Sequence, residues 1–356
     1  MRQHEVSIAD IARAAGVSHT TVSRALRESP LISVETRRTI QQLAREMGYT
    51  PNLVAQSLQT RRTKTLGLVV TSIADPFLGD VVKGVEEVAR AANFSVLLAT
   101  SHNDPEQEMA IIETFHRRRV DGILIESSRI TNNYKDRFEH LRIPTVLINS
   151  QAESEADLFH WVSVDDYLGA RMAVEHLLSL GHRAIGYLGV NNRPRSNRQR
   201  LQGYQDALSA AKIAWQESWM VVLPDNHTSH DEDVSVGQAA LPLLYGAGIT
   251  AVFCYNDMLA VGVLLACRRL GIAVPAQLSV VGFDDIHLAG YMVPALTTIH
   301  QPKVQLGQMA TQVLLDLLQQ RPGQNHILLP TLVQRASTAQ LVVSSHQEAS
   351  HRQAER

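Results

Sequence analysis

Three polar side chains with DNA-reading chemistry lie close together near the N-terminus: His19, Thr20 and Arg24. If this segment is helical, positions 20 and 24 share a face one turn apart. A guanidinium can fork onto O6 and N7 of guanine, and an imidazole or hydroxyl can donate to or accept from other base edges. Further hydroxyls nearby could hold phosphates, as hydroxyls and helix N-termini often do: Ser18, Thr21, Ser23, Ser33 and Thr36. This spacing is typical of a helix that enters the major groove.

A second set of polar side chains follows apolar runs that read as strands. In the first half of the body these residues include Asp75, Asn103 and Asn149, with the aromatic Phe77 close to Asp75 in the sequence. In the second half the corresponding places hold the polar segment 191–200, which ends at Arg200, and then Asn256 and Asp284. Ligands of open parallel sheets bind beyond the carboxyl ends of the strands. Asp, Asn and Arg there, with an aromatic face, suit a hydroxyl-rich small molecule.

Three short helices position the first set. Ser7 is expected to cap the first, with Asp10 as an imperfect capping box, and Gly16 permits the turn that follows. Ser18 caps a second helix to about Arg27, and Ser33 caps a third that ends near Gly48. Two helices joined by a tight turn, with a third in support, make a helix-turn-helix unit over residues 1–50.

Strands alternate with amphipathic helices from Leu66 onward, which is the pattern of doubly wound parallel sheets in an α/β fold. About eight strands suffice for two lobes. Between the two parts, residues 51–64 read as a short helix with Pro51 near its start, followed by a basic linker. That helix is too short to be stable alone in water. The polar tail 341–356 is expected to be disordered.

Charge is divided unevenly along the chain. Net charge is −2, but residues 1–64 carry ten Lys or Arg against five Asp or Glu, which makes this part +5 and the remainder −7. A small basic unit on an acidic body indicates that the basic unit binds a polyanion. The two cysteines form no disulfide framework, and no apolar run is long enough to span a membrane. We therefore expect a cytoplasmic protein that needs no cofactor, no metal and no membrane.

The whole pattern resembles the LacI/GalR family of bacterial regulators. The resemblance rests on residues 7–70, from SIADIARAAGVSHTTVSRALRESP to TLGLVV, and continues through DPF, GHRAIGYLG, RLQGY, YNDMLAVG, SVVGFDD and LTTIHQP. It implies a repressor that binds pseudo-palindromic operator DNA as a homodimer, with a periplasmic-binding-protein-like body over 65–340. The implied first lobe covers about 65–163 plus 293–325, and the second covers about 164–292 plus 326–340.

The same resemblance assigns roles to particular residues. Residues 51–58 correspond to a hinge helix, in which Leu58 would wedge between base pairs of the minor groove and Asn52 would contact a phosphate. A sugar or sugar derivative would be held by side chains from both lobes: Phe77, Asn103, Asn149, Ser196, Arg200, Asn256, Asp284 and Gln301.

Plainer interpretations of these residues remain open. Asn256 could simply cap the following helix, Asp284 could be a turn residue, and Gln301 could hold a crossing between lobes. Phe77 could be core, and Leu58 could pack in a linker. Two departures from well-known sugar-binding members put the ligand in doubt: Asn149 stands where an acidic residue is common, and residues 224–227 replace a region that can carry tryptophan.

Rival functions can be weighed against the motifs. The sequence has no phosphate-binding glycine motif, no nucleophile elbow and no metal-binding HExxH, which argues against an enzyme. A transport binding protein of the same fold would need a signal peptide and no DNA-binding unit. A regulator that binds a nucleobase, sugar phosphate or sugar acid, as an inducer or a corepressor, remains the alternative.

Overall fold

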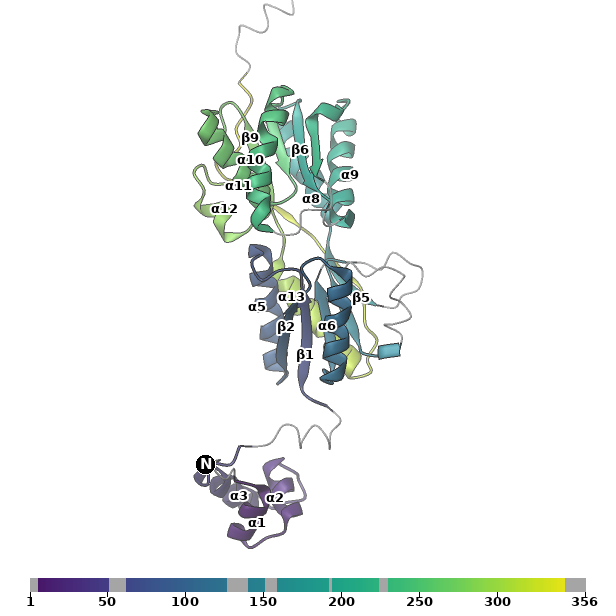
Figure 1. Ribbon diagram of the computed structural model, residues 1–356, viewed down its shortest axis with the longest axis vertical. Helices are drawn as coiled ribbons and strands as arrows, with labels where there is room; N and C mark the ends of the chain where they lie inside the picture. Colours follow the sequence, from purple (N-terminus) through teal and green to yellow (C-terminus); the bar gives the residue numbers. More distant parts are fainter. Residues whose placement is uncertain are drawn as a thin grey trace, which may run out of the picture. The chain divides into compact units, whose positions relative to one another are not determined.

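The computed structural model describes residues 6–50, 62–126, 140–150, 159–191, 194–223 and 230–342. It divides into two compact units, residues 1–63 and 64–356. The α/β architecture expected from the sequence is confirmed, with a three-helix unit followed by two parallel-sheet lobes (Figure 1).

The first unit consists of α1 (Ile8–Ala15), α2 (His19–Leu26) and α3 (Val34–Glu46). Ser7 and Asp10 form a complete capping box, because each side chain accepts from the other residue's backbone N–H. Gly16 ends α1 with a φ of 65°, a conformation that glycine adopts without a Cβ penalty. The helices pack around a small core made by Ile11, Ala12, Val22, Ala25, Ile40 and Ala44.

The first lobe is a six-stranded sheet in the order β11-β5-β4-β3-β1-β2. Its strands are β1 (Thr65–Val70), β2 (Ser95–Thr100), β3 (Gly122–Glu126), β4 (Thr145–Ile148), β5 (His160–Val164) and β11 (His326–Leu328). Its helices are α5 (Pro76–Ala91), α6 (Pro105–Arg117) and α13 (Lys303–Leu318). Helices α5 and α13 supply one core and α6 supplies another, so the buried sheet is covered on both faces.

The second lobe repeats this plan with the strand order β12-β10-β9-β8-β6-β7. Its strands are β6 (Ile185–Val190), β7 (Met220–Leu223), β8 (Ala251–Cys254), β9 (Ser279–Asp284), β10 (Thr297–His300) and β12 (Thr331–Val333). Its helices are α8 (Asp166–Ser179), α9 (Pro194–Ala210), α10 (His230–Gly246), α11 (Asp257–Leu270) and α12 (His287–Tyr291). Only the edge pair β10–β12 is antiparallel among the pairings of the described strands.

The chain crosses between lobes after β5, after β10 and after β11. The first crossing lies near the expected position 163 and the third, after Leu328, lies near the expected 325, whereas the second, after His300, differs from the expected 292. Strand β10 pairs with β9 and therefore still belongs to the second lobe, and β11 pairs with β5 in the first. The reason is geometric: the chain changes lobe at the carboxyl end of a strand, and β10 does not reach that end until His300.

Candidate functional site

Helix α2 presents the candidate base-reading residues on its exposed side. His19, Thr20 and Arg24 are exposed, while Val22 and Ala25 on the same helix are buried in the three-helix core. The sequence pattern HTTVSRAL therefore forms the helix and separates its polar face from its packing face.

The hydroxyls expected to contact phosphate have local partners. Ser18 Oγ accepts from Thr21 N at 3.1 Å, and Ser33 Oγ accepts from Thr36 N at 3.2 Å, so both serines cap helices. Ser23 Oγ accepts from the Arg27 guanidinium at 2.8 Å. All five hydroxyls lie in or next to the first turns of α2 and α3, or one turn further along α2. Asn52 and Leu58 lie outside the described residues, and their roles stay predictions.

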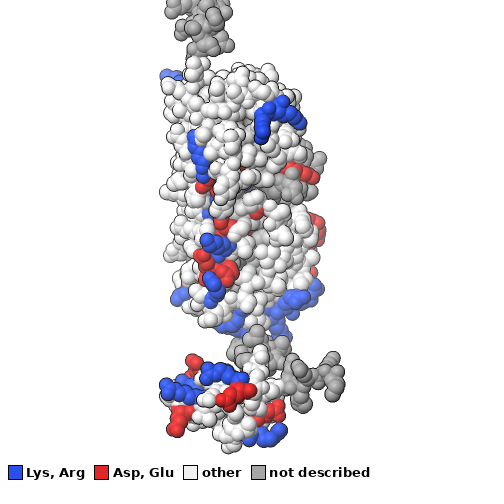
Figure 2. All heavy atoms as spheres, turned by 90° about the vertical axis from the view of Figure 1, so that its left-hand side faces the viewer, with Lys and Arg blue, Asp and Glu red and all other residues white. Residues whose placement is uncertain are grey.

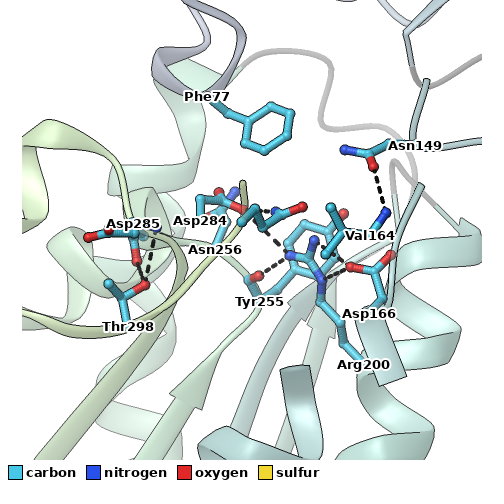
Figure 3. Close-up of polar contacts among 12 residues, drawn as sticks. Phe77, Asn149, Val164, Asp166, Arg200, Tyr255, Asn256, Asp284, Asp285 and Thr298 are labelled. Carbon is cyan, nitrogen blue, oxygen red and sulfur yellow. Dashed lines mark hydrogen bonds and ion pairs between the residues drawn. The ribbon is translucent and has the colours of Figure 1, made fainter. Parts of the chain in front are cut away.

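Arg200 is the centre of a polar cluster at the carboxyl ends of the second lobe's strands (Figure 3). Its Nε and a terminal nitrogen both donate to Asp166 Oδ1 at 2.8 Å, and another nitrogen donates to the Tyr255 carbonyl. The guanidinium carbon lies 3.7 Å from the Phe283 ring centre and 4.3 Å from that of Tyr255. The buried cation is therefore fixed in orientation by an ion pair and two aromatic rings.

Asp284 joins Arg200 to Gln301. The nearest distance between Asp284 Oδ1 and the Arg200 guanidinium is 3.9 Å, and Gln301 Nε2 donates to the same oxygen at 2.6 Å. Gln301 is buried, and its Oε1 has no hydrogen-bond partner among the described residues. A buried acceptor without a partner costs free energy, so a donor from a ligand would stabilise it.

Lys303, the first residue of α13, fixes the backbone that carries Asp284. Its Nζ donates to the carbonyls of Asp284 at 2.6 Å and Asp285 at 2.7 Å. Asp284 has a φ of 117° and Asp285 a φ of 54°, both unusual for residues with a Cβ. Because α13 packs in the first lobe, this contact links the two lobes directly at the polar cluster. Strained backbone of this kind persists where surrounding contacts hold it.

Burial and neighbouring charges shift the pKa values of these carboxyls. Burial raises the pKa of Asp284 to about 6, although Arg200 acts to lower it, and Asp75 from the first lobe acts to raise it. Burial also raises the pKa of Asp257, with a further contribution from Asp284. By contrast, His300 and Arg335 outweigh partial burial and lower the pKa of Asp285 to about 2. Burial acts to lower the pKa of Arg200, but Asp166, Tyr255 and Asp284 raise it overall.

Asn256 makes its hydrogen bonds within the second lobe. Its Oδ1 caps α11 by accepting from Leu259 N at 2.8 Å, and its Nδ2 donates to Asp233 at 2.7 Å. The neighbouring Asp257 is fully buried and accepts from Thr298 Oγ1 at 2.6 Å and Ile286 N at 2.9 Å. Asn256 therefore ties the start of α11 to α10, and Asp257 holds the loop after β9 in place.

The remaining candidates lie around this cluster in different ways. Phe77 is buried in the first lobe, and its ring extends from α5 toward the cluster in Figure 3. Asn149 Oδ1 accepts from Val164 N at 3.3 Å and so holds the end of β5. Asn103 and Ser196 are buried at the starts of α6 and α9. A hydrogen bond and an ion pair directly connect Asp284 with Gln301 and Arg200.

Sequence reasoning missed Asp166, Asp257 and Lys303 as parts of the cluster. Asp166 follows a strand, as the other candidates do, but β5 (His160–Val164) was not among the strands expected from the sequence. Asp257 follows a predicted strand, but only its neighbour Asn256 was expected to contact the ligand. Lys303 had no local signal, because its role depends on α13 crossing to the first lobe.

The described residues can also be considered for membrane-spanning helices and for metal sites. None of their helices is long and apolar enough to cross a membrane. No group of three or more His, Cys, Asp or Glu in the described ranges could hold a metal ion.

Comparisons with known proteins agree with this geometry. Residues 7–52 match the model for bacterial regulatory proteins of the lacI family, and residues 174–338 match a periplasmic binding protein-like domain. The lac repressor dimer bound to operator and the anti-inducer ONPF has a TM-score of 0.80 at 27% identity, over 94% of this chain and 100% of that one. An Enterococcus faecium regulator with bound ribose has a TM-score of 0.68 at 30% identity, over 78% and 100%.

Curated relatives align along most of their length. The regulator GalS of Salmonella typhimurium is 38% identical over 94% of this chain and 97% of its own. The ribose operon repressor of Haemophilus influenzae is 36% identical over 92% and 97%. The repressor PurR of Proteus mirabilis is 33% identical over 94% and 97%. This chain therefore belongs to the lacI family of bacterial regulatory proteins and is a DNA-binding transcriptional regulator.

Proposed function

We propose that this regulator is a repressor that senses a neutral sugar or sugar derivative bound against Arg200, Asp284 and Gln301. The observation that carries the proposal is the buried Gln301 Oε1, which has no hydrogen-bond partner in the described part of the chain and lies beside an oriented carboxylate and guanidinium. Hydroxyl groups both donate and accept, so one sugar hydroxyl could satisfy the Gln301 oxygen while another contacts Asp284. The Phe77 ring would supply an apolar face.

The charges of the cluster favour a neutral ligand over an anionic one. Arg200 is already paired with Asp166 and lies near Asp284. Lys303 is engaged by two carbonyls and lies 3.9 Å from Asp80. An added phosphate or carboxylate would meet cations whose charge is largely compensated. Relatives agree: one is named a ribose operon repressor, and another structure holds ribose.

A nucleobase is the second candidate, because a relative at 33% identity is the repressor PurR. A purine could use the same Asp284 and Gln301 pair for hydrogen bonds at its edge. The two candidate ligands differ in the expected response of the regulator. A sugar would act as an inducer, so that its binding releases the operator, and this is the response we prefer. A nucleobase would act as a corepressor.

Thermal unfolding in the presence of pentoses, hexoses, sugar acids, sugar phosphates and nucleobases tests the proposal. A ligand at 100 times its Kd should stabilise the protein by about 2.7 kcal/mol. The isosteric variant Asp284→Asn should lose that stabilisation and the operator response to the ligand, while it keeps operator binding. Arg268→Gln, an exposed arginine of α11, is the matched control. Stabilisation by a nucleobase or anion alone, or an unchanged response of Asp284→Asn, would contradict the proposal.

A further inference from the structure

One end of the first lobe concentrates exposed cations. We call Lys64, Arg117, Arg118, Arg119 and Arg142 the basic rim, and all five are exposed. Figure 2 shows Lys and Arg side chains gathering at this end of the body, in contrast to the mixed charges along its side. The body as a whole is acidic, so this local excess of positive charge needs an explanation.

Strand register explains why these residues share one end. Lys64 directly precedes β1, and its carbonyl accepts from Ser95 N at the start of β2. Asp121 N, just before β3, donates to the Thr65 carbonyl, and Ile123 N donates to the carbonyl just before β4. Because the strands are parallel, residues that precede them line the same amino-terminal edge of the sheet. Arg119 and Arg142 hold such positions, and α6 ends there at Arg117.

Contacts within the body explain only some of the cations of the basic rim. Arg117 donates to Thr114 Oγ1 at 3.0 Å, and cations at a helix C-terminus interact favourably with its dipole. Lys64 Nζ lies 4.4 Å from the centre of the Phe94 ring, a contact that leaves its charge uncompensated. Two acids near this end are paired with cations outside the rim, Glu86 with Arg90 at 3.3 Å and Asp316 with Arg321, whereas Asp121 accepts from Thr65 N and keeps its charge against five cations. The rim therefore keeps a positive potential toward solvent.

We propose that the basic rim binds phosphates of the operator duplex outside the base pairs that α2 reads. The chain enters the body through the rim, at Lys64, and residues 51–63 are all that separate it from residues 1–50, which carry the three N-terminal helices. Thirteen residues span at most about 45 Å even when fully extended. A rim tethered this closely to bound DNA contributes sequence-independent affinity, because each contacted phosphate releases counterions.

Salt dependence of DNA binding separates this contact from base reading. The double variant Arg117→Gln/Arg118→Gln removes two exposed charges from the end of α6 in the full-length protein. On an operator with long flanks, the slope of log K against log salt should fall by about 2 to 4, because each phosphate contributes roughly 0.9 and a dimer loses up to four contacts. Affinity in low salt should fall about tenfold or more. A duplex trimmed to the operator alone should show no difference.

The chain offers a matched control in the second lobe. Arg268 and Arg269 are also consecutive exposed arginines at the end of a helix, α11, and Arg268→Gln/Arg269→Gln changes net charge equally. This control should bind both duplexes as the wild type does, and both variants should melt at the wild-type temperature. If the rim variant matches the control on the long duplex, or loses equal affinity on both duplexes, the rim does not bind flanking DNA.

Discussion

Asp284 combines a strained backbone, an ion pair and a raised pKa in one residue. It lies at the end of β9, where the carbonyl contacts of Lys303 and the Gln301 amide fix it. Burial of a carboxyl that keeps only partial compensation by Arg200 disfavours its charged form. Such placement of a titratable group is more typical of a binding site than of a core.

The stability of the protein should therefore depend on Asp284 in a defined pH window. Its folded pKa of about 6 lies above the ordinary 3.8, so the folded state binds more protons between about pH 4 and 6. Stability contributed by this group is present below pH 4 and is lost as pH rises through 6. Asp284→Asn, which stays neutral, should be more stable than wild type at pH 7.5 by up to about 3 kcal/mol. Thermal unfolding at pH 4 and 7.5 checks this, and an equal difference at both pH values would contradict it.

Arg24 carries the sharpest prediction for the first unit. Arg24→Ala should weaken binding to the specific operator by about 1–3 kcal/mol and relax the preference at one base pair, because it removes a bidentate contact to guanine. Operator libraries measured by competition in constant salt would show this. Arg13→Ala, an exposed arginine of α1 paired with Asp10 at 3.3 Å, is the control. Equal loss on specific and random DNA would assign Arg24 to phosphate instead.

The close approach of helices α5 and α13 could not be predicted from sequence patterns. A Cβ on Gly84 of α5 would lie 2.0 Å from the Val304 carbonyl of α13, and one on Gly307 would lie 2.1 Å from the Val81 carbonyl. The two glycines therefore let α5 and α13 approach backbone to backbone. Residues 84 and 307 are far apart in sequence, so neither signals its partner.

Alanine substitutions along α5 should separate packing from helix propensity. Gly84→Ala should destabilise the body by about 1–3 kcal/mol, because the helices must move apart to admit a methyl group. Gly79→Ala on the same helix meets nothing within 4 Å and should be stabilising by about 0.5–1 kcal/mol. Denaturant unfolding of both variants measures the difference. A neutral Gly84→Ala would show that the close approach contributes little.

Sequence patterns predicted the elements well where caps or unbroken apolar runs marked them. Capping residues and periodicity located the three N-terminal helices, and apolar runs located eight strands, including the four-residue β4 and β7. Strands β10, β11 and β12 escaped because their polar residues leave no apolar run of four or more. Missing β5 also concealed Asp166, the ion-pair partner of Arg200. Positions of single residues after long strands were predictable, but their hydrogen-bond partners were not.

At the scale of the whole molecule, an exposed apolar surface marks where a second copy should pack. Tyr291 is 78% exposed and Val293 is 92% exposed, next to Leu288 on α12. Apolar surface of this kind commonly forms protein interfaces. Two-fold operator DNA requires two helix-turn-helix units, and a symmetric dimer supplies them.

Charges placed on this surface should therefore separate the subunits. Tyr291→Asp/Val293→Asp should sediment as a monomer at concentrations where wild type is a dimer, and it should bind one half-site weakly. Leu243→Asp on α10, at a position 69% exposed, should leave the dimer intact. Sedimentation with and without a palindromic duplex distinguishes these outcomes. A dimeric Tyr291→Asp/Val293→Asp would place the interface elsewhere.

Because the chain crosses between the lobes three times, the first lobe cannot be completed on the ribosome before most of the second lobe has been synthesised. The first lobe begins at Lys64, yet α13 (Lys303–Leu318) fills part of its core and β11 (His326–Leu328) completes its sheet. Strands β1 to β5 must therefore wait, with the surface meant for Leu306, Ala310 and Leu314 uncovered, until 150 further residues, from 165 to 314, have been synthesised. At 5–20 residues per second, this delay lasts roughly 10–30 seconds. The lobe started first is completed only with the last strands, so the nascent chain depends on protection from aggregation while translation finishes.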